Sequence, residues 1–393
     1  MCITASCRIL NWNGSEMQPA DFKELQEAIA NAKSLEVLGN GTKRGMARPV
    51  KAEGKLDLSR LNAITSYEPE ELVFSALAGT SRQQAEAALT QASQMFAFEP
   101  PDLSALLGTQ STGTLGGMIA TNLSGPRRLK AGAVRDHVLG FEAVSGRGEI
   151  FKAGGRVVKN VTGYDLPKLM TGSWGTLAVL HEVTLKVLPR PESEMTLVVH
   201  GLAPQDAAQA MSAAMGSAAE VSGAAYLPQT RDTFIRIEGI TPSLFARRVM
   251  LETVLKHFGP LSLLAESISR AQWIAIRDAV VLNAGSHEAI WRVSVAPMDG
   301  HRMLDAVQSA RGFMDWAGGL VWLALPDRGD AGAGQVQAAV KVLGGHALLI
   351  RAAQNIREKV DCMTPEPAPL AALNARVKSA FDPQNILNPG RMR

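Results

Sequence analysis

Three loops rich in glycine, threonine, serine and asparagine stand out in the first half of the sequence. They read GNGTKRG at residues 39–45, TGTLGGMIATNLSG at 112–125 and TGSWGTLA at 171–178. Glycine lets a backbone approach a ligand closely, the N–H groups of such loops form concave anion sites, and hydroxyl groups add neutral donors. Together the loops predict a site for an elongated ligand with a central pyrophosphate. Tight turns in a strand-rich domain are the alternative.

The spacing within these loops differs from the two common phosphate-binding motifs. The sequence contains no G-x-x-x-x-G-K-[ST], and no G-x-G-x-x-G that opens a helix after a strand. Basic side chains around the loops could neutralise a phosphate, with solvated surface charge as the alternative. These side chains are Lys43, Arg44, Arg127, Arg128, Arg135 and Lys159.

The usual side-chain catalysts are missing. The seven histidines are scattered without an H-x-x-H or H-x-H pair, so we expect no bound metal. The nucleophile motif G-x-S-x-G does not occur. The three cysteines, Cys2, Cys7 and Cys362, form no C-x-x-C pair that could hold zinc or an iron–sulfur cluster. We assign no catalytic residue, and the pattern favours a cofactor that brings its own reactivity.

Composition places the chain among ordinary globular proteins. It has 393 residues, 46% of them hydrophobic and 20% charged, which suggests two or three domains. A net charge of +3 and an aromatic content of 5% argue against a nucleic-acid partner. The N-terminus has no apolar run of signal-peptide length, and no stretch approaches the ~20 apolar residues of a membrane span. We therefore expect a cytoplasmic protein that meets a membrane only through partners.

Periodicity and turn residues predict an α+β architecture with two parts. PRPE at residues 189–192 marks the boundary between them, and TPEPAPL at 364–370 marks a second break. In the first part we expect helices at 19–33, beginning at Pro19, and at 81–95, strands at 35–39, 56–64 and 71–79, and a hairpin at 138–154. Beyond residue 194, strands alternate with helices expected at 204–217, 243–258, 301–314 and 333–343, before a last helix at 369–380. This alternation predicts a two-layer domain with a largely antiparallel sheet.

Longer motifs carry a resemblance to a known family. They read FEPP from residue 98, TLGGMIATNLSGPRRLKAGAVRDHVLGFEAVSGRGE from 114, GRVVKNVTGYDLPKLMTGSWGTLAVLHEVTLKVLPRP from 155 and FDPQNILNPGRM from 381. Over about half of its length the chain resembles the FAD-binding oxidases and dehydrogenases of the vanillyl-alcohol oxidase type, and within them the FAD-binding subunits of bacterial glycolate oxidases. The resemblance implies a flavin domain at residues 1–192, built of two subdomains with FAD between them. It also implies a cap domain at 193–364 and a C-terminal segment, 365–393, that returns to the flavin domain.

The resemblance also implies which residues hold FAD. The first loop corresponds to a pyrophosphate loop, in which Asn40 stands where the family usually has glycine, and Trp174 in the third loop stands where it often has an acidic residue. The expected contacts are Gly39, Asn40, Gly41, Thr42, Lys43, Pro101, Thr114, Gly116, Gly117, Thr121, Ser124, Gly125, Gly172, Gly175, Thr176, Val179 and Asn388. Covalent members attach the flavin to a histidine in the first loop. No histidine lies there, and His137 is the nearest other, so we expect non-covalent FAD.

Relatives that oxidise D-2-hydroxy acids carry an HPGDGN-like motif that builds a metal site beside the flavin. The segments HEAIWRVSVAP and GGHALLIRA do not supply it. The resemblance thus implies a flavin subunit of a complex that oxidises glycolate to glyoxylate, with a second FAD-binding catalytic subunit and an iron–sulfur subunit as partners. Two alternatives stay open. One is a self-sufficient FAD-dependent dehydrogenase of another small 2-hydroxy acid such as D-lactate, and the other is a scaffold subunit whose flavin site is degenerate.

Overall fold

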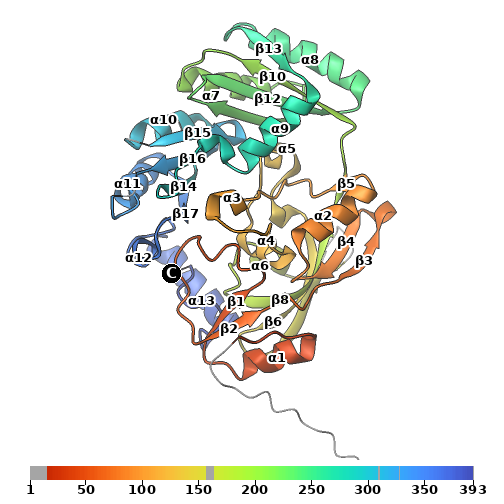
Figure 1. The fold of residues 1–393 in the computed structure, drawn as a ribbon, viewed down its shortest axis with the longest axis vertical. Coiled ribbons are helices and arrows are strands. Elements are labelled where there is room, and N and C mark those ends of the chain that lie inside the picture. The colour runs from red at the N-terminus through yellow and green to blue at the C-terminus, as the bar shows by residue number, and fades with distance from the viewer. Residues whose placement is uncertain (1–15, 156–162, 309, 327, 393) are drawn as a thin grey trace, which may run out of the picture.

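A computed structural model describes residues 16–155, 163–308, 310–326 and 328–392 (Figure 1). Cys2, Cys7, Lys159 and most of the GRVVKNVT stretch lie outside the described residues. Within them the chain forms an α+β fold with a flavin-type part at one end and a second, larger sheet at the other. The predicted fold class is therefore confirmed.

The first subdomain is small and begins with α1 (Phe22–Ala30). The carboxylate of Asp21 accepts a hydrogen bond from Glu24 N at 2.8 Å and caps this helix, so the expectation that Pro19 begins it is wrong. The strands β1 (Leu35–Leu38) and β2 (Gly54–Asp57) pair in parallel beside it. Ile386 and Leu387 from the C-terminal tail complete the hydrophobic core of this subdomain, so the chain closes on its own beginning.

The second subdomain is a five-stranded antiparallel sheet. Its order is β3 (Ile64–Glu68), β4 (Val73–Leu77), β8 (Ala178–Lys186), β6 (Val138–Ser145) and β7 (Ile150–Gly154). The hairpin expected at 138–154 is present as β6 and β7. The strand expected at 56–64 is wrong, because that stretch spans the end of β2, a turn and the start of β3.

Helices pack against this sheet or connect its strands. The helix α2 (Arg82–Gln91) ends four residues before the expected boundary. Shorter helices are α3 (Ser104–Leu107), α4 (Leu115–Thr121), α5 (Arg128–Ala131) and α6 (Leu166–Met170), and the strands β5 (Gln94–Met95) and β9 (Leu188–Pro189) form a two-residue pairing. We interpreted the second glycine-rich stretch as a loop, but its middle is α4. There, packing against the sheet outweighs the low helix propensity of two glycines.

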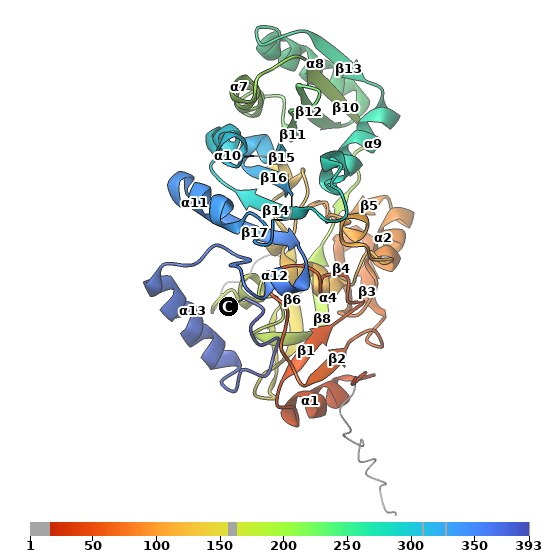
Figure 2. The same ribbon diagram turned by 60° about the vertical axis from the view of Figure 1, so that its left-hand side comes forward.

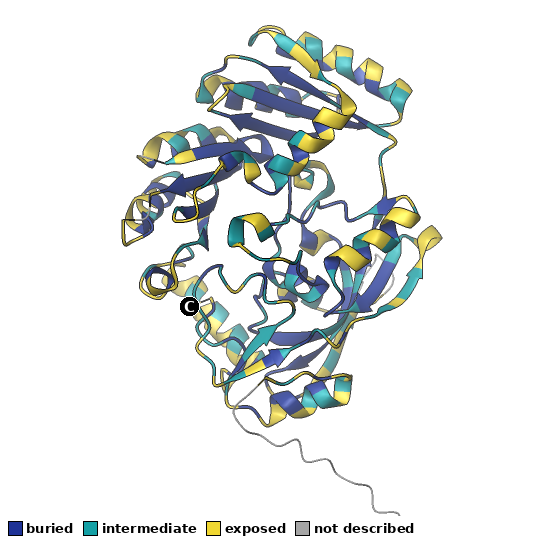
Figure 3. Ribbon diagram, viewed as in Figure 1, coloured by how far each residue is buried: buried dark blue, intermediate teal, exposed yellow. Residues whose placement is uncertain are grey.

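The cap is an eight-stranded sheet in which the strand pairs of the described residues are all antiparallel. In spatial order its strands are β13 (Leu261–Leu264), β10 (Ser193–Val199), β12 (Asp232–Gly239), β11 (Val221–Leu227), β15 (Arg311–Asp315), β16 (Leu320–Leu325), β14 (Ala289–Ser294) and β17 (His346–Arg351). Its helices are α7 (Pro204–Met215), α8 (Thr241–Leu255), α9 (Glu266–Arg277), α10 (Gly300–Ala306) and α11 (Ala333–Leu343). Figure 2 shows α7, α10 and α11 along one face of this sheet, with α9 on the other. Apart from the edge strand β13, the strands are mostly buried, whereas the helices keep an exposed outer side (Figure 3).

Two elements of the cap depart from the expectations. The helix expected at 301–314 ends at Ala306, and residues 311–315 form β15, because this segment pairs with β16 on one side and β11 on the other. Sheet pairing and burial outweigh local helical periodicity there. The helix α9 was not predicted. After the cap, α12 (Gln354–Arg357) and α13 (Ala368–Phe381) lead back to the flavin domain.

A buried network of four charged side chains joins the cap to the flavin domain. Arg236 on β12 donates to Glu99 Oε2 at 2.9 Å, and Arg127 donates to Glu238 Oε1 at 2.7 Å and approaches Glu99 at 3.1 Å. Burial raises the pKa of Glu238, but the Arg236 and Arg127 guanidiniums outweigh it and hold the pKa at about 2. Each buried charge here has a partner, so the network fixes how the cap faces the flavin domain.

Candidate cofactor-binding site

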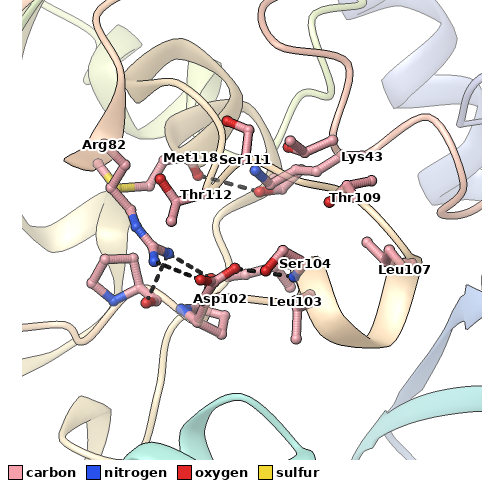
Figure 4. A pocket seen from close by; sticks show the side chains of 15 residues that line it. Lys43, Arg82, Asp102, Leu103, Ser104, Leu107, Thr109, Ser111, Thr112 and Met118 are labelled. Atoms are coloured by element: carbon pink, nitrogen blue, oxygen red, sulfur yellow. Dashed lines mark hydrogen bonds and ion pairs between the residues drawn. The ribbon is translucent and has the colours of Figure 1, made fainter. Parts of the chain in front are cut away.

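Three adjoining pockets form one cleft in the flavin domain. The first encloses about 550 Å³ of space open to solvent beside loop 39–44, and the second about 530 Å³. They share Gly39, Thr114, Gly117 and Asn388 in their walls. The third, of about 410 Å³, shares Lys43 with the first and continues the cleft toward the cap (Figure 4). The cleft is therefore elongated, as the glycine-rich loops predicted.

Glycine is required where the first two loops meet. A Cβ on Gly39 would collide with Thr114 Oγ1, and a Cβ on Gly116 would lie 3.0 Å from the carbonyl oxygen of Ala78. Thr114 Oγ1 accepts a hydrogen bond from Gly117 N at 3.3 Å and caps α4. These contacts bring β1 and α4 close enough for their backbones to form one wall of the cleft.

The C-terminal tail joins the first and third loops. Asn388 Oδ1 accepts from Val37 N at 2.8 Å, and its amide nitrogen donates to the carbonyl oxygen of Trp174 at 2.9 Å. Trp174 has a φ of 56° and Gly175 has one of 66°, so the third loop turns in the left-handed region at this point. A single amide side chain thus holds together segments that lie far apart in the sequence.

Lys43 supplies the main positive charge inside the cleft. It lines both the first and the third pocket, and among the described residues no hydrogen bond or ion pair to its ammonium group is found. Burial and, to a smaller extent, the charge of Arg82 lower the pKa of Lys43 to about 8, although Asp102 opposes them. A partly buried cation without a partner favours an anionic ligand.

Other cations near the cleft already have partners. Arg44 is half-exposed and donates to both oxygens of Glu36, at 2.8 and 2.7 Å. Arg391 donates to the carbonyl oxygens of Arg48 and Lys43, and its guanidinium lies 5.1 Å from the centroid of the Trp174 ring. Burial lowers the pKa of Arg391 to about 10. Arg391 lines the cleft and was not predicted, although a basic residue next to NPG was the available signal.

The cleft brings most of the predicted residues together. Those in its walls are Gly39, Asn40, Gly41, Thr42, Lys43, Pro101, Thr114, Gly116, Gly117, Thr121, Gly175, Val179 and Asn388. The walls also contain residues that the sequence did not single out. Thr109 is one, with a buried hydroxyl oxygen that has no hydrogen-bond partner in the described part of the chain. That orphaned hydroxyl suits a polar ligand.

The other four predicted residues do not line these three pockets. Ser124 Oγ accepts from Val134 N at 3.1 Å, and the carbonyl oxygen of Gly125 accepts from Trp316 Nε1 of the cap at 2.9 Å. Gly172 N donates to Ile119 O at 3.0 Å, and Thr176 Oγ1 donates to Ser173 O at 2.7 Å. Their contacts hold the walls in place, and their role as cofactor ligands stays a prediction.

The described residues contain no group of three or more His, Cys, Asp or Glu side chains placed to hold a metal ion. None of the helices in the same ranges has the length and apolar character needed to span a membrane.

Comparison with known proteins identifies the family. The FAD binding domain family matches residues 16–154. Glycolate oxidase subunit GlcE of Escherichia coli K12 is 33% identical over 372 residues, which cover 94% of this chain and 96% of that protein. The chain belongs to the GlcE family of glycolate oxidase subunits. Its cofactor is accordingly FAD, and it is an FAD-dependent oxidoreductase.

Other relatives of this GlcE-family chain match shorter regions. Glycolate oxidase subunit GlcD of Bacillus subtilis is 44% identical over 101 residues, 26% of this chain and 21% of that protein. A D-lactate dehydrogenase of Anaerostipes hadrus is 33% identical over 175 residues, 44% of this chain and 35% of its own length. The solved structure of alkyldihydroxyacetonephosphate synthase has a TM-score of 0.67 and 16% identity, covering 95% of this chain and 76% of that one. That likeness shows the fold.

The cleft fits FAD. Gly39 and Gly116 permit close backbone approach, the unpaired ammonium of Lys43 suits a diphosphate, and Thr109 offers an unused buried hydroxyl. The length of the three joined pockets suits a dinucleotide better than a small metabolite.

Proposed function

We propose that this chain is the non-covalent FAD-binding subunit of a complex that oxidises glycolate to glyoxylate. The observation that carries the proposal is a cleft with an unpaired, partly buried lysine, in a chain similar to a glycolate oxidase subunit over almost its whole length. In this proposal residues 1–192 hold FAD, 193–364 form the cap, and 365–393 return to the cleft. The contact of Asn388 with Val37 supports the last of these assignments.

FAD, when bound, supplies the hydride acceptor for oxidation of the carbon that bears the hydroxyl group. The residues of this chain bind and orient it. Lys43 neutralises diphosphate charge, Gly39 and Gly116 allow the backbone to approach, and Asn388 keeps the first and third loops together. His137 is the histidine nearest to the one that covalent members use. Its side chain is buried and its Nε2 lies 2.8 Å from the carbonyl oxygen of Ala131, which supports non-covalent binding.

The proposed partners are a second FAD-binding catalytic subunit and an iron–sulfur subunit. Support comes from the names of the two glycolate oxidase relatives, each of which is called a subunit. Cys362 is the one cysteine in the described residues, and burial raises the pKa of its thiol to about 11, which makes it a poor cluster ligand. The proposed location is the cytoplasm, with peripheral contact to the inner membrane through the complex.

The test begins with the purified chain. Its visible spectrum and the FAD released on denaturation are measured, and glycolate is then added anaerobically with and without the co-expressed partners. We expect a yellow protein that releases FAD on denaturation and that glycolate bleaches only when the partner subunits are present. A colourless chain that takes up no added FAD would contradict the flavin assignment and favour a scaffold role.

The match to a D-lactate dehydrogenase supports one alternative, a self-sufficient dehydrogenase of another small 2-hydroxy acid. Bleaching of the isolated chain by D-lactate, without any partner, would replace the subunit proposal with this one. The scaffold reading rests on Asn40 and Trp174. Both residues line the cleft, and Asn40 Nδ2 donates to Ser111 Oγ at 2.9 Å.

A further inference from the structure

A second cluster of positive charge lies where the cap meets the flavin domain. Its centre is Trp316, which follows β15 and donates from Nε1 to the carbonyl oxygen of Gly125 at 2.9 Å. The guanidinium carbons of Arg128 and Arg292 lie 4.3 and 4.7 Å from the centroid of the Trp316 ring. Arg128 belongs to the flavin domain and Arg292 to β14 of the cap, so the cluster is assembled by both domains.

These two arginines lack the partners that neighbouring arginines have. Arg127 and Arg236 are bound to Glu99 and Glu238 in the same interface, whereas no ion pair or side-chain hydrogen bond of Arg128 or Arg292 is found among the described residues. Arg292 is 8% exposed, and its buried Nη2 atom has no hydrogen-bond partner. A buried guanidinium with an unused donor is costly unless an anion pairs with it.

The groups around the cluster do not supply that anion. Burial and, to a smaller extent, the charge of Arg128 lower the pKa of Arg292 to about 9, although Asp315 opposes them. Burial raises the pKa of Asp315 to about 7, and its Oδ1 accepts from Trp316 N at 2.7 Å rather than pairing with an arginine. The pKa of His346 is lowered by burial and then by Arg292 and Arg128. The local field is therefore positive, and Asp315 beside Arg292 and Asp136 beside Arg128 compensate it only in part.

We propose that Arg292 and Arg128 bind the carboxylate of a small 2-hydroxy or 2-oxo acid at the interface between the domains. A guanidinium presents parallel N–H donors that match the two oxygens of a carboxylate. The cluster contacts Gly125, which the family resemblance places among the FAD contacts, while the diphosphate of FAD is assigned to Lys43 in the cleft. The proposal deepens the proposed function and rests on it for the class of acid.

The test is anaerobic calorimetric titration of the FAD-loaded chain with glyoxylate, with acetate, which has no hydroxyl-bearing carbon to dehydrogenate, and separately with inorganic phosphate. The variants are Arg292→Leu and Arg128→Gln. The control is Arg270→Gln, which removes an exposed, ion-paired arginine from α9 of the same cap. FAD content is measured for each protein.

We expect glyoxylate to bind the wild-type chain and the Arg270 variant equally. We expect its Kd to rise at least about tenfold in each of the other two variants, with FAD content unchanged. Absence of carboxylate binding, unchanged binding in both variants, or tighter binding of phosphate than of either carboxylate would overturn the proposal. If Arg292→Leu does not fold, Arg128→Gln decides, because Arg128 is exposed. A chain that binds glyoxylate but no FAD would refute the proposed function and leave this site standing.

Discussion

Replacing Lys43 tests the assignment of the diphosphate site most directly. Without ligand, burial holds the pKa of Lys43 at about 8, against a usual value of 10.5. A diphosphate beside the ammonium would return the pKa toward 10.5. At ~1.36 kcal/mol per pKa unit the full shift corresponds to ~3 kcal/mol. Because the lysine keeps part of its surface in the open cleft, solvent screening makes the interaction energy with the diphosphate smaller than this full value. We therefore expect Lys43→Met to weaken FAD binding about ten- to a hundredfold at pH 7.

The same shift predicts a dependence on pH with a defined sign. In the ligand-free chain the lowered pKa means that charged Lys43 destabilises the fold below pH 8, and this cost disappears as the pH rises toward 10.5. Lys43→Met should therefore raise the melting temperature of the FAD-free chain at pH 7 while it weakens FAD binding. In the wild type, the Kd for FAD should be constant below about pH 7 and rise up to about tenfold per pH unit above pH 8.

In the assay, FAD is titrated into protein from which the cofactor has been removed, and quenching of the flavin fluorescence is followed. The titration is repeated at pH values from about 6 to about 9.5, a range chosen so that the protein stays folded. Lys55→Met is the matched control, because Lys55 is an exposed lysine on β2 of the same domain. If Lys43→Met binds FAD as tightly as the control and keeps the same pH profile, the assignment of the diphosphate to Lys43 is refuted.

Three further substitutions test how the cleft and the domain interface are built. Gly39→Ala should lower FAD affinity and the melting temperature, because its Cβ would collide with Thr114 Oγ1, and adding Thr114→Ala should restore part of both. Glu99→Gln should destabilise the chain by ~3 kcal/mol in urea unfolding, because it leaves buried guanidiniums without their counter-charge. Asn388→Ala should release FAD and make the tail sensitive to limited proteolysis, because it removes the bond to the Trp174 carbonyl oxygen.

Each of these substitutions has a control in the same region. The control for Gly39→Ala is Gly45→Ala, whose Cβ comes no closer than 3.8 Å to Leu107 and which should be tolerated. The control for Glu99→Gln is Glu53→Gln, which changes an exposed carboxylate. The control for Asn388→Ala is Gln384→Ala, which changes an exposed side chain of the tail. Equal effects of a variant and its control would show that the contact named for that variant is unimportant.

The glycine-rich loops, and the class of ligand that they hold, were determined by the sequence itself. Turn-forming glycines, N-capping hydroxyls and alternating strands are local properties, so the hairpin of β6 and β7 and the helix α11 lie where periodicity placed them. Local pattern failed where long-range pairing decided. Residues 311–315 read as the end of a helix, but they form a central strand because β11 and β16 lie on either side.

The tertiary structure alone decided which of these residues meet. Asn388 and Val37 are 351 positions apart in the sequence, and only the closure of the tail onto β1 makes them hydrogen-bond partners. Arg128 and Arg292 also come together only in the folded chain. Nothing in the sequence distinguishes these two arginines from Arg127 and Arg236, which form ion pairs. A charge becomes a binding group when folding buries it without a partner, and burial and pairing depend on distant segments that no local pattern encodes.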